Sequence, residues 1–294
     1  MKSSNVSLRR HEPLKRGLLR TIEILADSVT AHSEQWRNDE QAVHRIRTTI
    51  KRLRALLRLI RPAVETAFFN LENERLRTAA RLLSFARDSE VARDTLKTLP
   101  VRERSAREAV NAVLPGLEKR VELARAHQPN VTEVKQRLTQ TKRSFRQLKF
   151  RDSDQEIIKS GIRRVYRQGR RRMKAAFQTG QASAYHRWRI RAKNLYYELQ
   201  FLEPIWPRPL RRMVSRLSKL QDRLGFAHDL TALRAELKKT PEAFGGDEAV
   251  QRVVSCLDHQ THKLRRAAEP LGRKIWREKP GRFSRRLRRQ WCKR

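Results

Sequence analysis

The chain has 294 residues, and its 69 Lys and Arg against 31 Asp and Glu give a formal net charge of +38 at pH 7. So strong a positive charge favours a polyanionic partner such as nucleic acid, an anionic membrane or a polyphosphorylated compound. Its two cysteines, Cys256 and Cys292, are too few for a disulfide scaffold or a thiolate metal site. No run of about 18 apolar residues and no signal-like start occur, so a cytoplasmic protein is expected.

Amphipathic helices account for nearly the whole sequence, and no alternating run of β-branched residues predicts a strand. In the first half, helices are predicted near 12–32, 39–60, 64–86 and 102–148, the last interrupted around Pro115 and Pro129. In the second half they are predicted near 155–178, 183–203, 208–225 and 247–278, with a shorter piece after each of the segments "ARD" and "AHD". Four antiparallel helices in each half predict two tandem four-helix bundles in an all-α protein.

Three blocks of the sequence recur in the same order at nearly one spacing. The segment "HRIRTTIKRLRALLRLIRP" at 44–62 aligns without gaps with "HRWRIRAKNLYYELQFLEP" at 186–204, an offset of 142. The pairs "LLSFARD" (82–88) with "RLGFAHD" (223–229) and "LKRGLLR" (14–20) with "IKSGIRR" (158–164) follow at offsets of 141 and 144. We interpret the blocks as an internal duplication that gives a pseudo-twofold pair of bundles.

The duplication divides the chain into parts. One domain is expected over 8–279, with a first bundle over about 8–148, a polar joint at 149–155 and a second bundle over about 156–279. Residues 280–294 form a basic C-terminal tail, which is interpreted either as a disordered polyanion-attracting arm or as the frayed end of the last helix.

A row of basic side chains runs along the helix predicted over 39–60. His44, Arg47, Lys51, Arg54 and Arg58 fall within about 80° of arc, beside an apolar stripe. Such a row places a cation at each turn, about 5.4 Å apart, and therefore suits a linear, repetitive anion. No nearby carboxylate in the sequence neutralises it.

The second copy repeats only the first part of this row. His186, Arg189 and Lys193 are kept, whereas Tyr196 and Gln200 replace the last two cations. We hypothesise that the preceding helix restores the lost charge through a further row, made of Arg163, Arg167, Arg171 and Lys174.

The two histidines at the heads of the rows, His44 and His186, suggest donors whose charge depends on pH. Surrounding cations favour the neutral ring and a bound phosphate favours imidazolium, so binding is expected to tighten as the pH falls toward about 6. A helix cap or a space-filling role is the alternative for each histidine.

Other candidate residues favour structural roles. Asp88 and Asp229 precede expected helices, which favours N-capping. Asp258, His259 and His262 favour a solvated helix face over a metal site, and no metal ligand set or cofactor is predicted. No phosphate-cradling glycine loop and no catalytic constellation appear, so the sequence does not predict an enzyme.

The paired "HRxRxxxKxL" helices, each followed by "L-[SG]-F-A-[RH]-D", resemble the CHAD family, the conserved histidine α-helical domain, over about residues 8–279. The resemblance implies two four-helix bundles in pseudo-twofold arrangement around a basic groove or pore that binds inorganic polyphosphate. By matching position, it implies ligand contacts at His44, Arg47, Lys51, Arg54, His186, Arg189 and Lys193. Arg45 and Arg187 match as well, although helical geometry directs them elsewhere.

The resemblance also bears on activity and partners. Some members carry a triphosphate-tunnel domain with alternating glutamates; this sequence lacks that pattern, so no hydrolase activity is implied. Some members attach to polyphosphate or polyester storage granules, and the sequence leaves this open. The favoured hypothesis is non-enzymatic binding of inorganic polyphosphate. The alternative is a helical RNA- or DNA-binding protein that uses the same basic surface, with weaker nucleic-acid binding as a further expectation.

Overall fold

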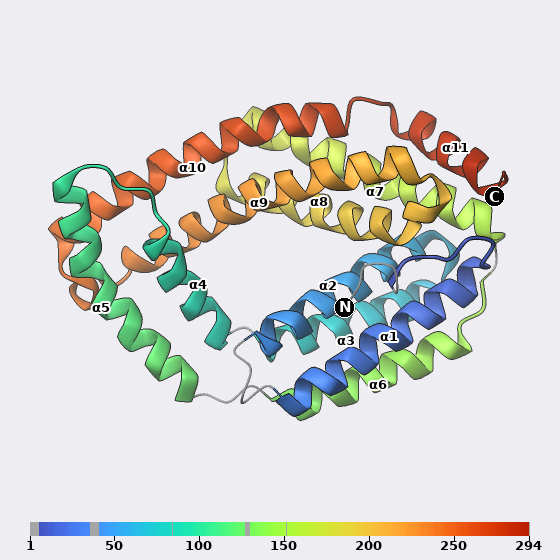
Figure 1. Ribbon diagram of the computed structural model, residues 1–294, viewed down its shortest axis with the longest axis horizontal. Coiled ribbons are helices and arrows are strands. Elements are labelled where there is room, and N and C mark those ends of the chain that lie inside the picture. Colours follow the sequence, from blue (N-terminus) through green and yellow to red (C-terminus); the bar gives the residue numbers. More distant parts are fainter. Residues whose placement is uncertain (1–5, 36–40, 84, 127–129, 151, 294) are drawn as a thin grey trace.

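The structure, a computed structural model, describes residues 6–35, 41–83, 85–126, 130–150 and 152–293, and these residues contain helices and no strand (Figure 1). The helices are α1 (Leu14–Gln35), α2 (Ala42–Leu59), α3 (Thr66–Arg81), α4 (Phe85–Lys97), α5 (Arg104–Ala126), α6 (Val131–Gln147), α7 (Asp154–Thr179), α8 (Ala182–Leu202), α9 (Pro207–Leu237), α10 (Asp247–Ile275) and α11 (Pro280–Trp291). Short 3₁₀ turns lie at Arg61–Ala63, Glu203–Ile205 and Pro241–Phe244. The prediction of an all-α protein is confirmed.

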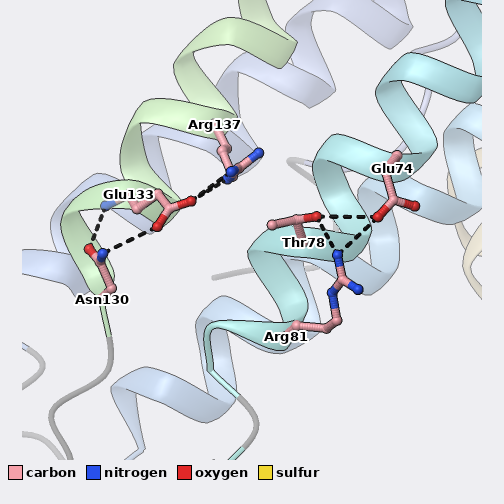
Figure 2. A network of polar contacts seen from close by, with 6 residues as sticks. All are labelled: Glu74, Thr78, Arg81, Asn130, Glu133 and Arg137. Carbon is pink, nitrogen blue, oxygen red and sulfur yellow. Dashed lines mark hydrogen bonds and ion pairs between the residues drawn. The ribbon is translucent and has the colours of Figure 1, made fainter.

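Four helices of the first half, α1, α2, α3 and α6, pack into a bundle (Figure 1). The apolar stripe of α2 is buried in it, and Ile46, Ile50 and Leu57 are fully enclosed. The N-terminus of α6 is capped by Asn130, whose side-chain oxygen accepts a hydrogen bond from the backbone N–H of Glu133 at 3.0 Å (Figure 2). Arg137 donates to the same Glu133 one turn further on, so this acidic side chain is neutralised locally.

The fourth helix expected over 102–148, with interruptions around Pro115 and Pro129, is two helices, α5 and α6, that have different neighbours. α5 passes through Pro115 without a break, and the expected break near Pro129 lies outside the described residues. α6 completes the first bundle, whereas α5 and α4 pack against α9 and α10 (Figure 1). Val113 and Leu117 of α5 share a separate apolar core with Leu233 and Leu257. Hydrophobic burial against the second half therefore decides where α5 lies.

In the second half, α9 is longer than expected because its apolar spacing continues through the "AHD" segment. Leu224, Ala227, Leu230 and Leu233 are all buried at helical spacing, so the helix runs on to Leu237 and no separate piece follows Asp229. The tail assigned to 280–294 is neither an arm nor the end of α10. It contains α11, which packs on α7 and buries Phe283 and Leu287.

The bundle of the first half meets the second half where α2 packs against α8 and α7. Backbones approach closely there, because a Cβ added at Gly161 of α7 would lie 2.0 Å from the carbonyl oxygen of Leu59. The start of α7 also supports the start of α1, since the backbone N–H of Leu14 donates to Asp154 Oδ2 at 2.8 Å. The duplication and the joint at 149–155 stay predictions. None of the helices described has the length and hydropathy needed to span a bilayer.

Candidate functional site

Four basic side chains gather where α2 crosses α8: Arg47 and Lys51 from α2, and Arg189 and Lys193 from α8. We call them the central basic cluster. Each is partly buried, and the charges of Lys193, Arg47 and Arg189 all act on Lys51. These are the residues that the sequence comparison aligned in pairs, Arg47 with Arg189 and Lys51 with Lys193. The packing of α2 on α8 therefore brings two predicted rows into one place.

Both lysines of the central basic cluster have lowered pKa values, so each loses its proton more readily than an exposed lysine does. Burial lowers the pKa of the Lys51 ammonium to about 7, and the charges of Lys193 and Arg47 act in the same direction. Burial and the charge of Arg189 lower the pKa of Lys193 to about 8. In the described part of the chain, neither lysine forms a hydrogen bond or an ion pair, so a bound anion would relieve an existing repulsion.

Two aspartates from other helices lie beside the central basic cluster, and neither is the N-cap that the sequence suggested. Asp229 lies in the interior of α9, where its charge opposes part of the lowering of the pKa values of Lys51 and Lys193. Asp88 lies in the first turn of α4, inside the helix, and its Oδ1 is 3.5 Å from a guanidinium nitrogen of Arg47. The same guanidinium donates to the carbonyl oxygen of Leu83 at 2.7 Å. Each aspartate thus offsets part of the positive charge.

The two predicted histidines occupy different environments. His44 lies exposed in the first turn of α2, whereas His186 is partly buried and its Nδ1 lies 3.4 Å from Nδ1 of His228 on α9. Burial and the charges of Arg189 and Arg187 lower the pKa of His186, as expected for a ring beside cations. Burial and Arg189 lower the pKa of His228 to about 4, so this ring is neutral near pH 7.

The last two cations of the α2 row turn away from the central basic cluster. Arg54 lies near Glu74 and Arg77 of α3, and burial lowers its pKa. Arg58 donates to the carbonyl oxygen of Arg54 at 2.8 Å and to Oδ1 of Asn73 at 3.2 Å. Burial, together with nearby arginines, lowers the pKa of Arg58 to about 10. The row therefore divides along α2 into two sites with different partners.

Arg58 belongs to a second group of charges, built around a fully buried carboxyl, that of Glu198 on α8. Arg58, Arg164 of α7 and Arg191 of α8 surround this carboxyl closely enough to lower its pKa, but burial outweighs them and raises it. Neither carboxylate oxygen has a hydrogen-bond partner among the described residues.

The row expected on α7 lies on the outside of the molecule. Its four residues, Arg163, Arg167, Arg171 and Lys174, are all exposed. The α7 residues whose charges reach α8 are instead Arg164 and Arg172, which lie near Arg191 rather than His186. The hypothesis that this row replaces the missing cations beside His186 is therefore corrected, because α7 turns another face toward α8.

Arg45 and Arg187 also lie apart from the central basic cluster, as their helical angles predicted. The charge of Arg45 acts on His32 of α1, and Arg187 is exposed on α8. Among the other predicted residues, Asp258 accepts a 3.0 Å hydrogen bond from Nε of Arg234. In the ranges that the structure describes, no group of three or more His, Cys, Asp or Glu is placed to hold a metal ion.

Sequence reasoning missed several residues of these groups, among them His228, Asp229, Glu198, Arg164 and Arg191. The first two lie in the repeated "FAHD" segment, for which the sequence analysis predicts the start of a helix. A continued apolar spacing beyond it, at Leu230 and Leu233, was the signal that the segment lies inside a helix.

A family model of the CHAD domain matches residues 20–238, more than half of the chain. The chain belongs to the CHAD domain family. No curated protein matches it significantly in sequence.

Solved structures support the CHAD fold. The chain is similar to the crystal structure of the CHAD domain from the plant Ricinus communis, with a TM-score of 0.67 and 18% identity over 94% of this chain and 96% of that one. It is also similar to PptA from Streptomyces chartreusis, with a TM-score of 0.59 and 13% identity over 91% of this chain and 100% of that one. At these identities the likeness concerns the fold alone.

Proposed function

We propose that this CHAD protein binds inorganic polyphosphate, without catalysis, at the central basic cluster. The carrying observation is that Arg47, Lys51, Arg189 and Lys193 converge from two helices into a partly buried place. Like charges that are held together without an equal number of carboxylates raise the free energy of the unliganded protein. An anion of high charge density removes this cost, and a polymer of phosphates supplies several such charges in a row.

Positions next to the cluster support a chain-like ligand rather than a single phosphate. His44 lies one turn before Arg47 on α2, and His186 lies one turn before Arg189 on α8. Cations and histidines thus follow each helix away from the crossing. A phosphate chain that passes over the crossing reaches donors on both sides, and arginine adds forked contacts to its oxygens.

Nucleic acid is the competing ligand, because its phosphates would respond to the same charge. A polyphosphate chain is narrower than a nucleic-acid strand and can enter a partly buried place. A nucleic acid would depend more on the exposed cations, such as those of the α7 row.

The test is a competition between polyanions. The full chain is titrated with polyphosphate of defined lengths at about 0.15 M salt, where loose Coulombic attraction is screened, with duplex DNA and RNA as competitors. We expect long polyphosphate to stay bound against an excess of either nucleic acid. Equal affinity for the three polyanions would exclude a polyphosphate-selective site and leave a general polyanion surface.

A further inference from the structure

A pocket of about 610 Å³ lies away from the central basic cluster, where the start of α9, the end of α10 and α11 meet. Its volume falls in the range of about 300–1,000 Å³ typical of small-molecule sites. Tyr166, Leu210, Ile275 and Phe283 line it with buried side chains, and Trp206 is partly buried at its wall. The pocket therefore has a size that suits a small organic molecule, with apolar and aromatic side chains at its base.

The opening of this pocket carries a large excess of positive charge. Six basic residues line it: Arg216, Lys274, Arg277, Lys279, Arg282 and Arg286. Among the described residues that line the pocket, Glu278 supplies the one carboxylate, with its oxygens 3.5 Å from Arg282 and 3.3 Å from Arg286. Within the part of the chain that is described, no ion pair is formed by Arg216, Lys274, Arg277 or Lys279. The ligand that fits this opening is an anion.

Aromatic rings form one side of the pocket and are held in place by their neighbours. Phe283 stacks on Tyr166 with ring centroids 4.7 Å apart, and the Tyr166 hydroxyl donates to the carbonyl oxygen of Ile275 at 2.8 Å. The guanidinium of Arg286 lies 4.6 Å from the ring centroid of Trp206. Indole and guanidinium planes of this kind receive a further flat ring by stacking.

Two helices also begin at this pocket. α9 starts at Pro207, next to Trp206, and α11 starts at Pro280, next to Lys279. The positive dipole ends of α9 and α11 favour phosphate, whereas the negative end of α10 at the same pocket opposes it, so the basic side chains supply most of the attraction for an anion.

We propose that this pocket binds a nucleotide, with the base against Trp206 and the phosphates among the basic residues at the opening. A flat ring explains the aromatic wall, and several phosphates explain the six cations. Most of those cations lie beyond residue 238, where the match to the CHAD family model ends. The inference is independent of polyphosphate binding, since no residue of the central basic cluster lines the pocket.

The experiment uses isothermal titration calorimetry of the full chain with ATP, inorganic triphosphate and dodecyl phosphate at about 0.15 M salt. We expect ATP to bind at least about tenfold more tightly than triphosphate, because only ATP adds a stacked base. Dodecyl phosphate, which has an aliphatic body, is expected to bind more weakly than ATP.

Matched variants on α11 locate the site. The double variant Arg282→Ala and Arg286→Ala removes two exposed cations at the pocket and should weaken ATP binding at least about tenfold. The control, Arg285→Ala with Arg289→Ala, removes the same charge from other exposed positions of α11 and should change the affinity for ATP less than about twofold. Trp206→Ala should remove the preference for ATP over triphosphate. Lys51→Ala with Lys193→Ala should leave ATP binding unchanged while it weakens polyphosphate binding.

Three results would overturn the proposal: equal affinity for ATP and triphosphate, equal losses in the two α11 variants, or tighter binding of dodecyl phosphate than of ATP. Circular dichroism checks that Trp206→Ala is folded. If it is not, the two α11 variants decide, because their substituted side chains are exposed.

Discussion

Two groups of four cations in this protein carry equal charge but differ in their burial and in the number of helices that contribute to them. The exposed α7 row, Arg163, Arg167, Arg171 and Lys174, stands on a single helix with its side chains in solvent. The central basic cluster takes two residues from each of two crossing helices and holds them partly buried. Sequence reasoning assigned both groups to the same ligand, because periodicity reports charge along a helix and not what lies opposite it.

The two groups differ in how strongly their like charges repel one another. Solvent screens the exposed row, so its members influence one another little. In the central basic cluster, burial and neighbouring charges lower the pKa of Lys51 to about 7 and that of Lys193 to about 8. A charge that the protein holds at a cost is one that a ligand can stabilise, and this favours the cluster over the row as a binding site.

The largest effect is expected from removing each group in turn. Replacing Arg47, Lys51, Arg189 and Lys193 with Ala should weaken polyphosphate binding at least about hundredfold, because the four proposed contacts to phosphate, all from partly buried side chains, are lost. Replacing the four residues of the α7 row with Ala removes an equal charge and should weaken polyphosphate binding less than about fivefold. Fluorescence titration at about 0.15 M salt measures both affinities. Equal losses would mean that net charge, rather than convergence, governs binding.

The next effect is the response of affinity to pH. The groups around Lys51 are Lys193 and Arg189 of α8, Arg47 of its own helix and Asp229 of α9. With a pKa of about 7, Lys51 is charged below that value and neutral above it, and Lys193 follows at about 8. Since a bound anion favours the charged forms, affinity is highest below pH 7 and should fall by up to about tenfold per pH unit for each lysine that becomes neutral.

Arginine substitutions separate this response from other titrations. Lys51→Arg with Lys193→Arg keeps the charge at high pH, so the affinity should stay nearly constant from pH 6.5 to 9. Lys174→Arg on the exposed row is the matched control and should follow the unsubstituted protein. A slope that survives in the double variant would assign the response to other groups, such as His186.

Features of the fold that depend on neighbours in the sequence could be predicted, whereas features that depend on distant packing partners could not. The all-α class and most helix positions follow from local periodicity, and α7, α8 and α10 begin within one residue of their predicted starts. An interruption between α5 and α6 was predicted around Pro129, but the packing of α5 against the second half was not, because it depends on the apolar core that α5 shares with α9 and α10. The periodicity of α5 marks its buried face, at Val113 and Leu117, but does not tell which helices cover that face.

The site divides in the same way. Arg47, Lys51, Arg189 and Lys193 were found because an aligned repeat places them on equivalent helix faces. The face of α7 was misjudged because Arg164, which comes near Arg191, is adjacent in sequence to the exposed Arg163. Neighbouring residues differ by about 100° around a helix, and only the packing partner tells which of them lies inside.

A smaller effect on stability tests the close approach that brings α2 against α7 and α8. Gly161→Ala places a Cβ against the backbone carbonyl of Leu59, which has little freedom to move, and should lower the free energy of unfolding by about 2 kcal/mol. Gly225→Ala is the matched control in α9. A Cβ there meets only Nε of Arg189 at 3.9 Å, so the substitution should raise stability by about 0.5–1 kcal/mol. Urea denaturation compares the two, and a neutral result at Gly161 would mean that the helices can separate slightly.

The smallest effect concerns Glu198, the buried carboxyl near Arg58, Arg164 and Arg191. Burial raises its pKa above the ordinary value, so the folded protein binds a proton more readily than the unfolded chain does. Stability due to this group is therefore present at low pH and falls as the pH rises from about 4.3 toward the raised pKa. Gln has the same shape without the charge, and Glu198→Gln should raise the free energy of unfolding at pH 7.5 by about 1 kcal/mol.

A second buried carboxylate provides the comparison for this prediction. Glu72 of α3 is equally enclosed, but it forms an ion pair with Arg75, so Glu72→Gln should lower the stability at pH 7.5. Urea denaturation of the unsubstituted protein and both variants at pH 4.5 and 7.5 measures these differences, and the gain from Glu198→Gln should shrink at the lower pH. A loss of stability in Glu198→Gln at pH 7.5 would mean that the three arginines stabilise the ionised carboxylate. Arg58, Arg164 and Arg191 would then be neutralised from within the fold, by the carboxylate of Glu198.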